Sequence, residues 1–201
     1  MMKNTQKAIR SIAAMRSMAG IIAIAIIIGF SMIACDDSGD DNTGTTYQIG
    51  STGPGGGIVF YDKGSDSDGW RYLEAAPADM ATTLTWASSG FENTDITGTG
   101  TAIGTGKANT AAILAVDANA PAAKACKDYN GGGKDDWFLP SMDELREMYK
   151  ARTHLGISSA VSFLSSSQGG SSNVLVQVFD NGDWGSSQKI AERNVRAIRA
   201  F

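Results

Sequence analysis

The stretch Trp137-Phe138-Leu139-Pro140-Ser141-Met142-Asp143-Glu144 joins a short apolar run to the clearest helix start in this chain. Ser141 is a favourable N-cap residue, and Glu144 stands three positions later, so the two side chains can form a capping box. Apolar residues then recur at helical spacing through Tyr149. We therefore predict a helix that begins at Ser141 and runs toward His154.

The chain after this helix has a β pattern. Residues 162–167 and 174–179 are β-prone runs, and the turn Asp180-Asn181-Gly182-Asp183 follows the second of them. Residues 195–201 alternate between two faces, which is typical of a strand. Because this last strand ends on the final Phe, we expect the C-terminus to lie within a sheet.

Two further β segments lie upstream. Residues 58–62 and 70–76 are predicted strands, and a polar turn over 64–69 separates them, so they are expected to pair as a hairpin. Residues 79–106 are rich in Thr, Gly and Ser, with isolated apolar anchors. An irregular stretch of this length inside a domain is usually functional or tightly held.

Two helical segments connect this stretch to the central run. Asn109 or Thr110 can cap a helix over 111–117, and a proline suited to a first turn favours a second helix over 121–129. Cys126 lies in the second helix, among alanines, and is predicted to be a small buried thiol.

The N-terminal segment has the pattern of an export signal that ends at a cysteine. Four Lys/Arg side chains come first, an uncharged apolar run spans 17–34, and Cys35 follows directly. Ser31-Met32-Ile33-Ala34-Cys35 resembles a bacterial lipobox, with Met32 where Leu is usual. We expect residues 1–34 to be a lipoprotein signal peptide and Cys35 to be lipidated. The alternative is an uncleaved signal anchor, since 18 uncharged residues are at the short end of what spans a bilayer.

The segment after the cysteine predicts how the domain is attached. Apart from Cys35, residues 35–46 are only Asp, Ser, Gly, Asn and Thr, a composition that cannot form a core and predicts a flexible tether. One domain over 47–201 remains. Export and a membrane anchor place this domain in the bacterial cell envelope, on the periplasmic or the surface face.

The charge of the mature chain limits its partners. The sequence has 17 basic and 21 acidic residues, and four basic but no acidic residues lie within 1–34, so the mature net charge is 13 − 21 = −8. Nucleic acids are recognised by clustered Lys and Arg. We therefore expect no nucleic-acid partner.

Motifs for catalysis, cofactors or metals are incomplete. A phosphate loop ending at Gly106-Lys107 would need a glycine five positions before that Gly106 and a Ser or Thr after the lysine, and it has neither. The calcium-loop-like Asp66-Ser67-Asp68-Gly69 lacks a carboxylate at the last position, which is Ala75. His154 is the sole histidine, and no Gly-x-Ser-x-Gly elbow occurs. We expect no enzyme activity, no cofactor and no metal.

The four tryptophans divide into two groups. Trp70, Trp86 and Trp137 stand in strand-like or anchor contexts and are predicted to be core residues. Trp184 follows a polar turn and is predicted to be exposed, as aromatic residues on sugar-binding surfaces are. The sequence thus offers a ligand-binding surface made by Asp180, Asn181, Asp183 and Trp184, together with the irregular 79–106 region.

Six blocks of the sequence together resemble one bacterial family. In chain order they are Gly53-Pro54-Gly55-Gly56-Gly57-Ile58-Val59-Phe60-Tyr61-Asp62, Tyr72-Leu73-Glu74-Ala75-Ala76-Pro77, Ile103-Gly104-Thr105-Gly106-Lys107-Ala108-Asn109-Thr110, Asp136-Trp137-Phe138-Leu139-Pro140-Ser141, Leu164-Ser165-Ser166-Ser167-Gln168 and Val195-Arg196-Ala197-Ile198-Arg199-Ala200-Phe201. Over residues 47–201 they resemble the Lcl C-terminal domain family, a domain of unknown function.

This resemblance implies an α+β, C-type-lectin-like fold, in which two helices pack on a small irregular antiparallel sheet with long loops. It also implies that the N- and C-terminal strands lie side by side. The fold is related to that of formylglycine-generating enzymes, whose catalytic cysteine pair has no counterpart here. The family's namesake is a collagen-like adhesin whose end domain binds sulfated polysaccharide, but this chain has no collagen repeat and is acidic.

The combined expectation is a lipoprotein with a lectin-like domain for ligand binding or adhesion. Its ligand would be a glycan or an envelope protein. The alternatives are a structural or assembly protein of the envelope and, further off, an enzyme related to the formylglycine-generating enzymes.

Overall fold

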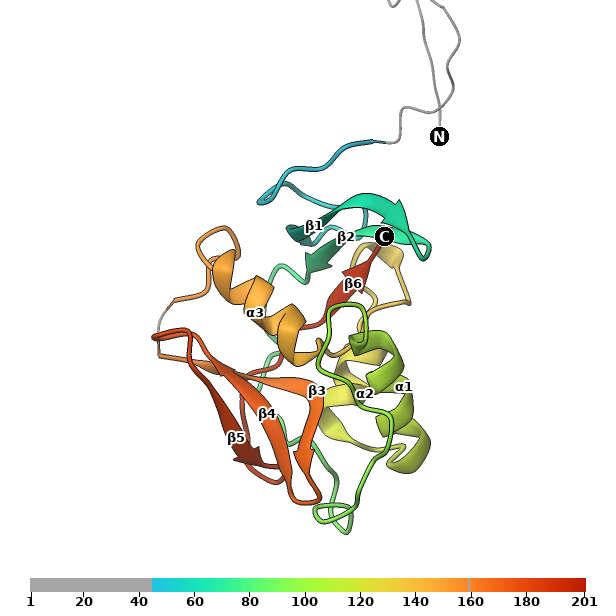
Figure 1. Ribbon diagram of the computed structural model, residues 1–201, viewed down its shortest axis with the longest axis vertical. Helices are drawn as coiled ribbons and strands as arrows, with labels where there is room; N and C mark the ends of the chain where they lie inside the picture. The colour runs from blue at the N-terminus through green and yellow to red at the C-terminus, as the bar shows by residue number, and fades with distance from the viewer. Residues whose placement is uncertain (1–44, 159) are drawn as a thin grey trace, which may run out of the picture. The chain divides into compact units, whose positions relative to one another are not determined.

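The computed structural model describes residues 45–158 and 160–201. Cys35, the signal segment and the tether through residue 44 lie outside the described residues. The elements, shown in Figure 1, are β1 (Ile58–Ser67), β2 (Trp70–Ala75), α1 (Gly106–Val116), α2 (Pro121–Asp128), the short 3₁₀ helix η1 (Gly131–Gly133), α3 (Met142–Lys150), β3 (Ser162–Gly170), β4 (Asn173–Val178), β5 (Trp184–Gln188) and β6 (Ile198–Ala200). None of the helices in this part of the chain is long and apolar enough to cross a bilayer.

The α+β class is confirmed, but the arrangement differs from the expected two helices on one sheet. The described residues form three α-helices and two antiparallel three-stranded sheets, ordered β1-β2-β6 and β3-β4-β5. The chain before β6 links the two sheets through hydrogen bonds to both. Leu164 N–H donates to the Asn194 carbonyl, and Ala76 N–H donates to the Ala197 carbonyl.

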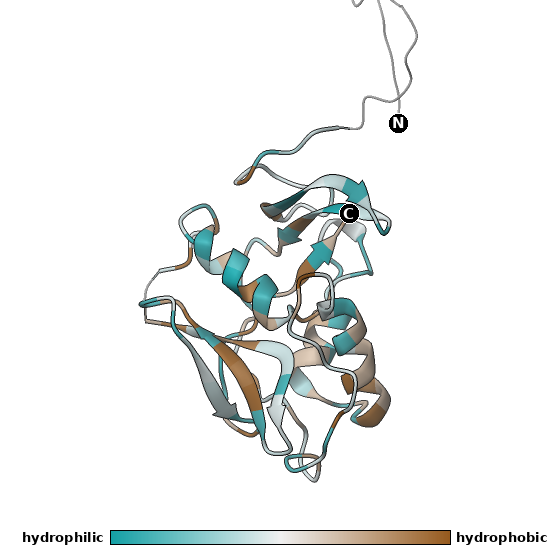
Figure 2. Ribbon diagram, in the orientation of Figure 1, coloured by the Kyte–Doolittle hydropathy of each residue, from teal (hydrophilic) through white to brown (hydrophobic). Residues whose placement is uncertain are grey.

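Two hydrophobic clusters form the core. The first packs α1, α2 and one face of the second sheet around Trp86 and Trp137, which are 0% and 1% exposed. The second lies between α3 and both sheets and includes Phe163 and Phe179. In Figure 2, β4 stands out as the apolar central strand of its sheet. Each such aromatic or aliphatic side chain contributes about 1.5–3 kcal/mol of burial.

Most predicted core positions are confirmed. Trp86, Trp137 and Cys126 are buried, and burial raises the pKa of the Cys126 thiol far above its ordinary range. The prediction that Trp70 is a core residue is wrong, because its side chain is only partly buried at the end of the first sheet. Its ring lies under the Lys63 amine, 3.9 Å from the ring centroid, and keeps one side near the surface.

Helix α3 begins as predicted. The Ser141 hydroxyl accepts a hydrogen bond from Glu144 N–H at 3.3 Å, and the Glu144 carboxylate accepts one from Ser141 N–H at 2.6 Å, so the capping box is complete. The helix ends at Lys150, before the predicted His154. His154 instead lies exposed in the turn that follows.

The predicted start of α1 is wrong. The helix begins directly after Thr105, so Asn109 and Thr110 lie inside it. Asn109 accepts a hydrogen bond from Gly100 N–H at 2.9 Å and donates one to the Gly100 carbonyl at 2.7 Å. Thr110 accepts one from Leu139 N–H at 3.0 Å. Both side chains therefore bond to backbone outside α1, and Thr110 also donates to the Gly106 carbonyl at 2.8 Å.

The terminal strands are partly as expected. The C-terminus lies in a sheet, since β6 pairs with β2. The predicted alternation of buried and exposed residues over 195–201 is wrong. Residues 195–198 are all buried, because both sides of the chain are covered there. β1 also extends through its predicted polar turn to Ser67. β1 and β6 are not neighbours, although the Tyr47 ring packs against Phe201 with centroids 5.1 Å apart.

A buried carboxylate fixes the glycine loop before β1. Glu74 is 0% exposed and accepts hydrogen bonds from Gly55 N–H at 2.9 Å and Gly57 N–H at 3.0 Å. Arg199 donates to the same carboxylate at 2.9 Å and also binds Asp136. Charge-assisted bonds of this kind are the stronger ones. Added Cβ atoms on Gly55 or Gly57 would clash, so the loop needs glycine.

A second buried carboxylate fixes the loop before α1. Glu144, besides its bond from Ser141, accepts a hydrogen bond from Gly104 N–H at 2.8 Å. A Cβ on Gly106 would lie 2.3 Å from this carboxylate, which explains the glycine there. Burial raises the pKa of Glu144, although the backbone N–H groups oppose this change. The glycine-rich blocks are thus parts of the scaffold.

Candidate ligand-binding site

The predicted residues Asp180, Asn181 and Asp183 form a self-contained turn between β4 and β5. Asn181 Nδ2 donates to the Asp183 carboxylate at 2.5 Å, and Asp183 N–H donates to Asn181 Oδ1 at 3.0 Å. Gln177 Nε2 donates to the carbonyl of Asp183 at 2.9 Å. Two of the three predicted polar side chains are therefore occupied in holding the turn itself.

Trp184 is exposed, as the sequence predicts, at 56%. The Arg146 guanidinium of α3 lies 5.6 Å from its ring centroid and pairs with Asp143 at 2.5 Å. This contact orients the indole against α3 and leaves much of its surface open to solvent. The four predicted residues thus remain neighbours at one end of β5, with Trp184 as the open aromatic surface.

A polar hollow lies at the other end of β5. It has a volume of about 320 Å³, and its lining comes from the segment between β2 and α1, the β3–β4 turn and the chain after β5. The lining residues are Glu92, Asn93, Ser172, Gln188, Lys189 and Ile190. Ile190 is 54% exposed and adds an apolar contact at the surface.

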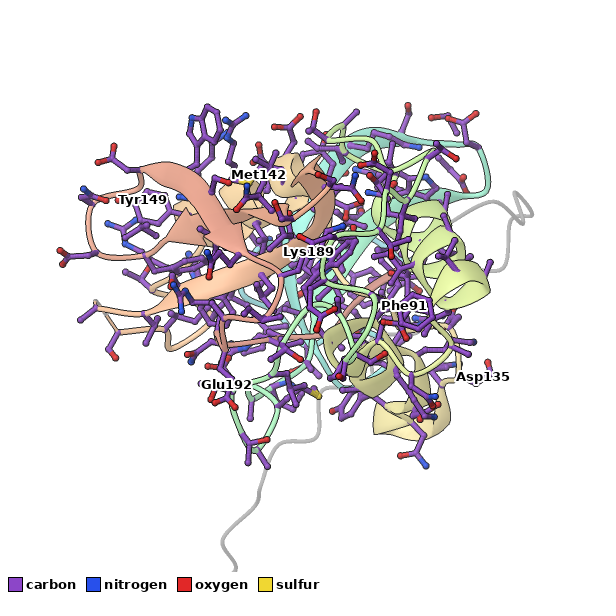
Figure 3. The ribbon with its side chains drawn as sticks, turned by 90° about the horizontal axis from the view of Figure 1, so that it is seen from below. Phe91, Asp135, Met142, Tyr149, Lys189 and Glu192 are labelled. Atoms are coloured by element: carbon purple, nitrogen blue, oxygen red, sulfur yellow. The ribbon has the colours of Figure 1, made fainter. Side chains whose placement is uncertain are left out.

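Lys189 holds this end of the domain together. Its side chain is fully buried, and Nζ donates to the Thr94 carbonyl at 2.6 Å and to Gln168 Oε1 at 2.9 Å. The Trp86 ring centroid lies 4.6 Å away, a cation–π contact. Figure 3 shows Lys189 against the green segment that carries Phe91. Burial lowers the pKa of Lys189, and the charge of Asp95 opposes this.

The lining of the hollow is suited to hydrogen bonding rather than to covalent chemistry. Backbone N–H groups lower the pKa of Glu92, so its carboxylate accepts hydrogen bonds at neutral pH. Asn93 and Gln188 are exposed and offer amide donors and acceptors. Lys189 is too deeply buried to attack a ligand. Within residues 45–158 and 160–201, no group of three or more His, Cys, Asp or Glu side chains could hold a metal ion.

The structure does not bring the two predicted binding regions together. Trp184 begins β5 and Gln188 ends it, so the predicted turn and the hollow are about 13 Å apart along the strand. Glu92 and Asn93 belong to the irregular region that the sequence singles out. The sequence gives no signal for Lys189, because a lysine in a polar run normally indicates a solvated surface.

Neither a family model nor any curated protein matches this chain. The choice between the two ends of β5 therefore rests on geometry. In the turn before Trp184, the side chains of Asn181 and Asp183 hydrogen-bond to each other. The hollow next to Lys189 instead presents polar groups from three segments of the chain.

Proposed function

We propose that this protein is a bacterial envelope lipoprotein, anchored through acylated Cys35, whose C-type-lectin-like domain over 47–201 binds a glycan. The observation that carries the proposal is the polar hollow over Lys189. Its carboxylate, amides and hydroxyl match the alternating donors and acceptors of a sugar, and Ile190 offers an apolar contact.

The position of the hollow supports this role. The chain enters the domain at Tyr47, beside the first sheet, and Figure 1 shows the β3–β4 turn and the long segment before α1 at the opposite end. Binding groups are often carried by loops at one end of a rigid scaffold. A domain tethered at Tyr47 could turn this end away from the membrane.

The charge of the site narrows the ligand class. Glu92 is ionised at neutral pH and Lys189 is not at the surface. The mature chain is also acidic. Sulfated or other anionic sugars would meet repulsion here, so neutral hexoses and amino sugars fit the site better.

The test is a glycan array with neutral, amino and sulfated sugars, probed with the full-length protein in detergent and followed by titration calorimetry on the best sugar. Asn93→Ala combined with Gln188→Ala should weaken binding at least tenfold, since each buried hydrogen bond lost costs about 1 kcal/mol. Asn119→Ala is the matched control, because Asn119 is exposed and outside the hollow. A folded protein that binds no array sugar but forms a defined oligomer by light scattering would favour the assembly role.

The anchor needs its own test. Cells fed an alkyne-tagged fatty acid should label the wild-type protein, and Cys35→Ala should remove the label. Mass spectrometry of the purified protein should also show that residues 1–34 are absent. An unlabelled protein that keeps its first residues would be the uncleaved signal anchor instead.

A further inference from the structure

A groove runs along α1, formed by two adjoining hollows that share Lys107, Ala111 and Phe138. One has a volume of about 270 Å³ and extends between α1 and the segment at Trp137. The other has a volume of about 510 Å³ and extends to Trp70 at the end of the first sheet. Neither hollow shares a residue with the one next to Lys189.

The walls of this groove are mostly apolar. Phe138 forms the shared floor, and Ala111 on the outer face of α1 leaves room above it. Leu114 closes one end and the partly buried Trp70 the other. The hollow at Trp137 has the more apolar lining, and its aromatic wall suits an aromatic or short acyl group.

Two lysines, Lys107 and Lys127, lie at the mouth of the groove, and two carboxylates, Asp136 and Asp68, also line it. Lys107 is exposed and, within the part of the chain that the structure describes, has no ion pair. Lys127 Nζ donates only to the Asp135 carbonyl, at 2.8 Å, so it too lacks a carboxylate partner there. The Asp136 carboxylate on the wall pairs with Arg199, which it shares with Glu74. Asp68 is 88% exposed and faces Lys63 at 3.8 Å.

We propose that this groove is a second ligand site, for a small organic anion whose carboxylate is carried on an aromatic or short acyl body. The carboxylate lies between the Lys107 and Lys127 amines, and the body packs on Phe138. Two amines without carboxylate partners beside a mostly apolar wall are complementary to such an anion. This site is independent of the glycan site.

The test compares cinnamate with its neutral isostere cinnamamide by titration calorimetry on the full-length protein, with empty detergent micelles subtracted. Cinnamate should bind with a Kd of about 1 mM or tighter and roughly fivefold more tightly than cinnamamide, because the ion pairs are partly exposed. Lys107→Gln should remove part of this preference, and Lys107→Gln combined with Lys127→Gln should reduce cinnamate to the affinity of cinnamamide. Ala111→Trp should fill the groove and abolish the binding of both compounds.

Lys150→Gln is the matched control, because Lys150 is an exposed lysine paired with Glu147 on α3, and it should change neither affinity. Circular dichroism confirms that each variant is folded, and Lys107→Gln tests the site even if Ala111→Trp does not fold. Absence of saturable cinnamate binding, equal affinity for the two compounds, or cinnamate binding unaffected by Lys107→Gln would each overturn the proposal.

Discussion

Glu74 and Lys189 are both fully buried charged residues that hold a loop, but they do so with different partners. Glu74 accepts two backbone N–H groups and pairs with Arg199, which in turn binds Asp136. Lys189 donates to a backbone carbonyl and a neutral amide. The first is a compensated ionic network, and the second is a buried cation without a directly bonded carboxylate.

This difference separates the two ends of the domain. The network around Glu74 fixes the glycine loop before β1, near Tyr47. The hydrogen-bonding groups of this network are occupied by one another. The loop over Lys189 is held by two bonds from the amine to neutral acceptors, and it lines the polar hollow. We expect the loop over Lys189 to open locally more readily than the loop held by the Glu74 network.

The largest effect is expected from Glu74→Ala. It should lower the free energy of unfolding by about 3–5 kcal/mol, because it leaves a buried Arg199 with a single carboxylate partner and the glycine N–H groups without acceptors. Urea unfolding followed by tryptophan fluorescence measures this. Glu192→Ala, at an exposed carboxylate, should stay within about 0.5 kcal/mol. A loss below about 1 kcal/mol at Glu74 would show that its network is not the stabilising one.

Glu144→Gln should cost about 1–3 kcal/mol, since a buried amide cannot accept all the N–H bonds of the carboxylate. The loss should also depend on pH. The folded pKa of Glu144 lies above its ordinary value of 4.5, so wild-type stability from this group is full at lower pH and declines as pH rises through the folded pKa. The wild-type advantage over the variant should therefore shrink with rising pH. Urea midpoints for both proteins, from about pH 4 to pH 8, test this, and a growing advantage would contradict it.

Lys189→Met should change the free energy of unfolding by no more than about 1 kcal/mol, because an apolar side chain of similar length removes an uncompensated buried charge. Its effect should instead be local. Backbone amides near Thr94 should exchange hydrogen faster, since the bond to the Thr94 carbonyl is lost. Hydrogen-exchange mass spectrometry of both proteins measures this. If Lys189→Met lowered the free energy of unfolding as much as Glu74→Ala, the two buried charges would not differ in their contribution to stability.

Trp184→Ala should have the smallest effect on stability, within about 0.5 kcal/mol, because the side chain is exposed. It also distinguishes the two ends of β5. If the hollow over Lys189 binds the glycan, the affinity measured by calorimetry should not change. If Trp184→Ala abolishes binding and the Asn93/Gln188 variant does not, the turn is the site.

The parts of the fold that depend on local chemistry are predictable from sequence. The start of α3 follows from Ser141 and Glu144, whose hydrogen bonds lie within one helical turn. The start of α1 is not predictable, because Asn109 bonds to Gly100 and Ser166 rather than to its own helix. Distant partners of this kind override a local capping preference.

The candidate site is less predictable still. Its lining joins the segment before α1 to Ser172 and Gln188 of the second sheet, residues that are far apart in the sequence. A polar turn and a strand end look like ordinary surface when each is taken alone. Lys189 differs from a solvated lysine only in its surroundings, which no local pattern records.

The contact between Tyr47 and Phe201 also determines how the domain would respond to force. The Tyr47 ring packs on Phe201, and its N–H donates to the Tyr72 hydroxyl at 3.2 Å. If the domain is anchored and binds a ligand as proposed, a pull through the segment before Tyr47 would load this aromatic contact first. The next bonds to bear load join Gly50 and Ser51 to Val59. Residues 47–51 would then detach one bond at a time, before the Glu74 network and the hollow over Lys189 bear load.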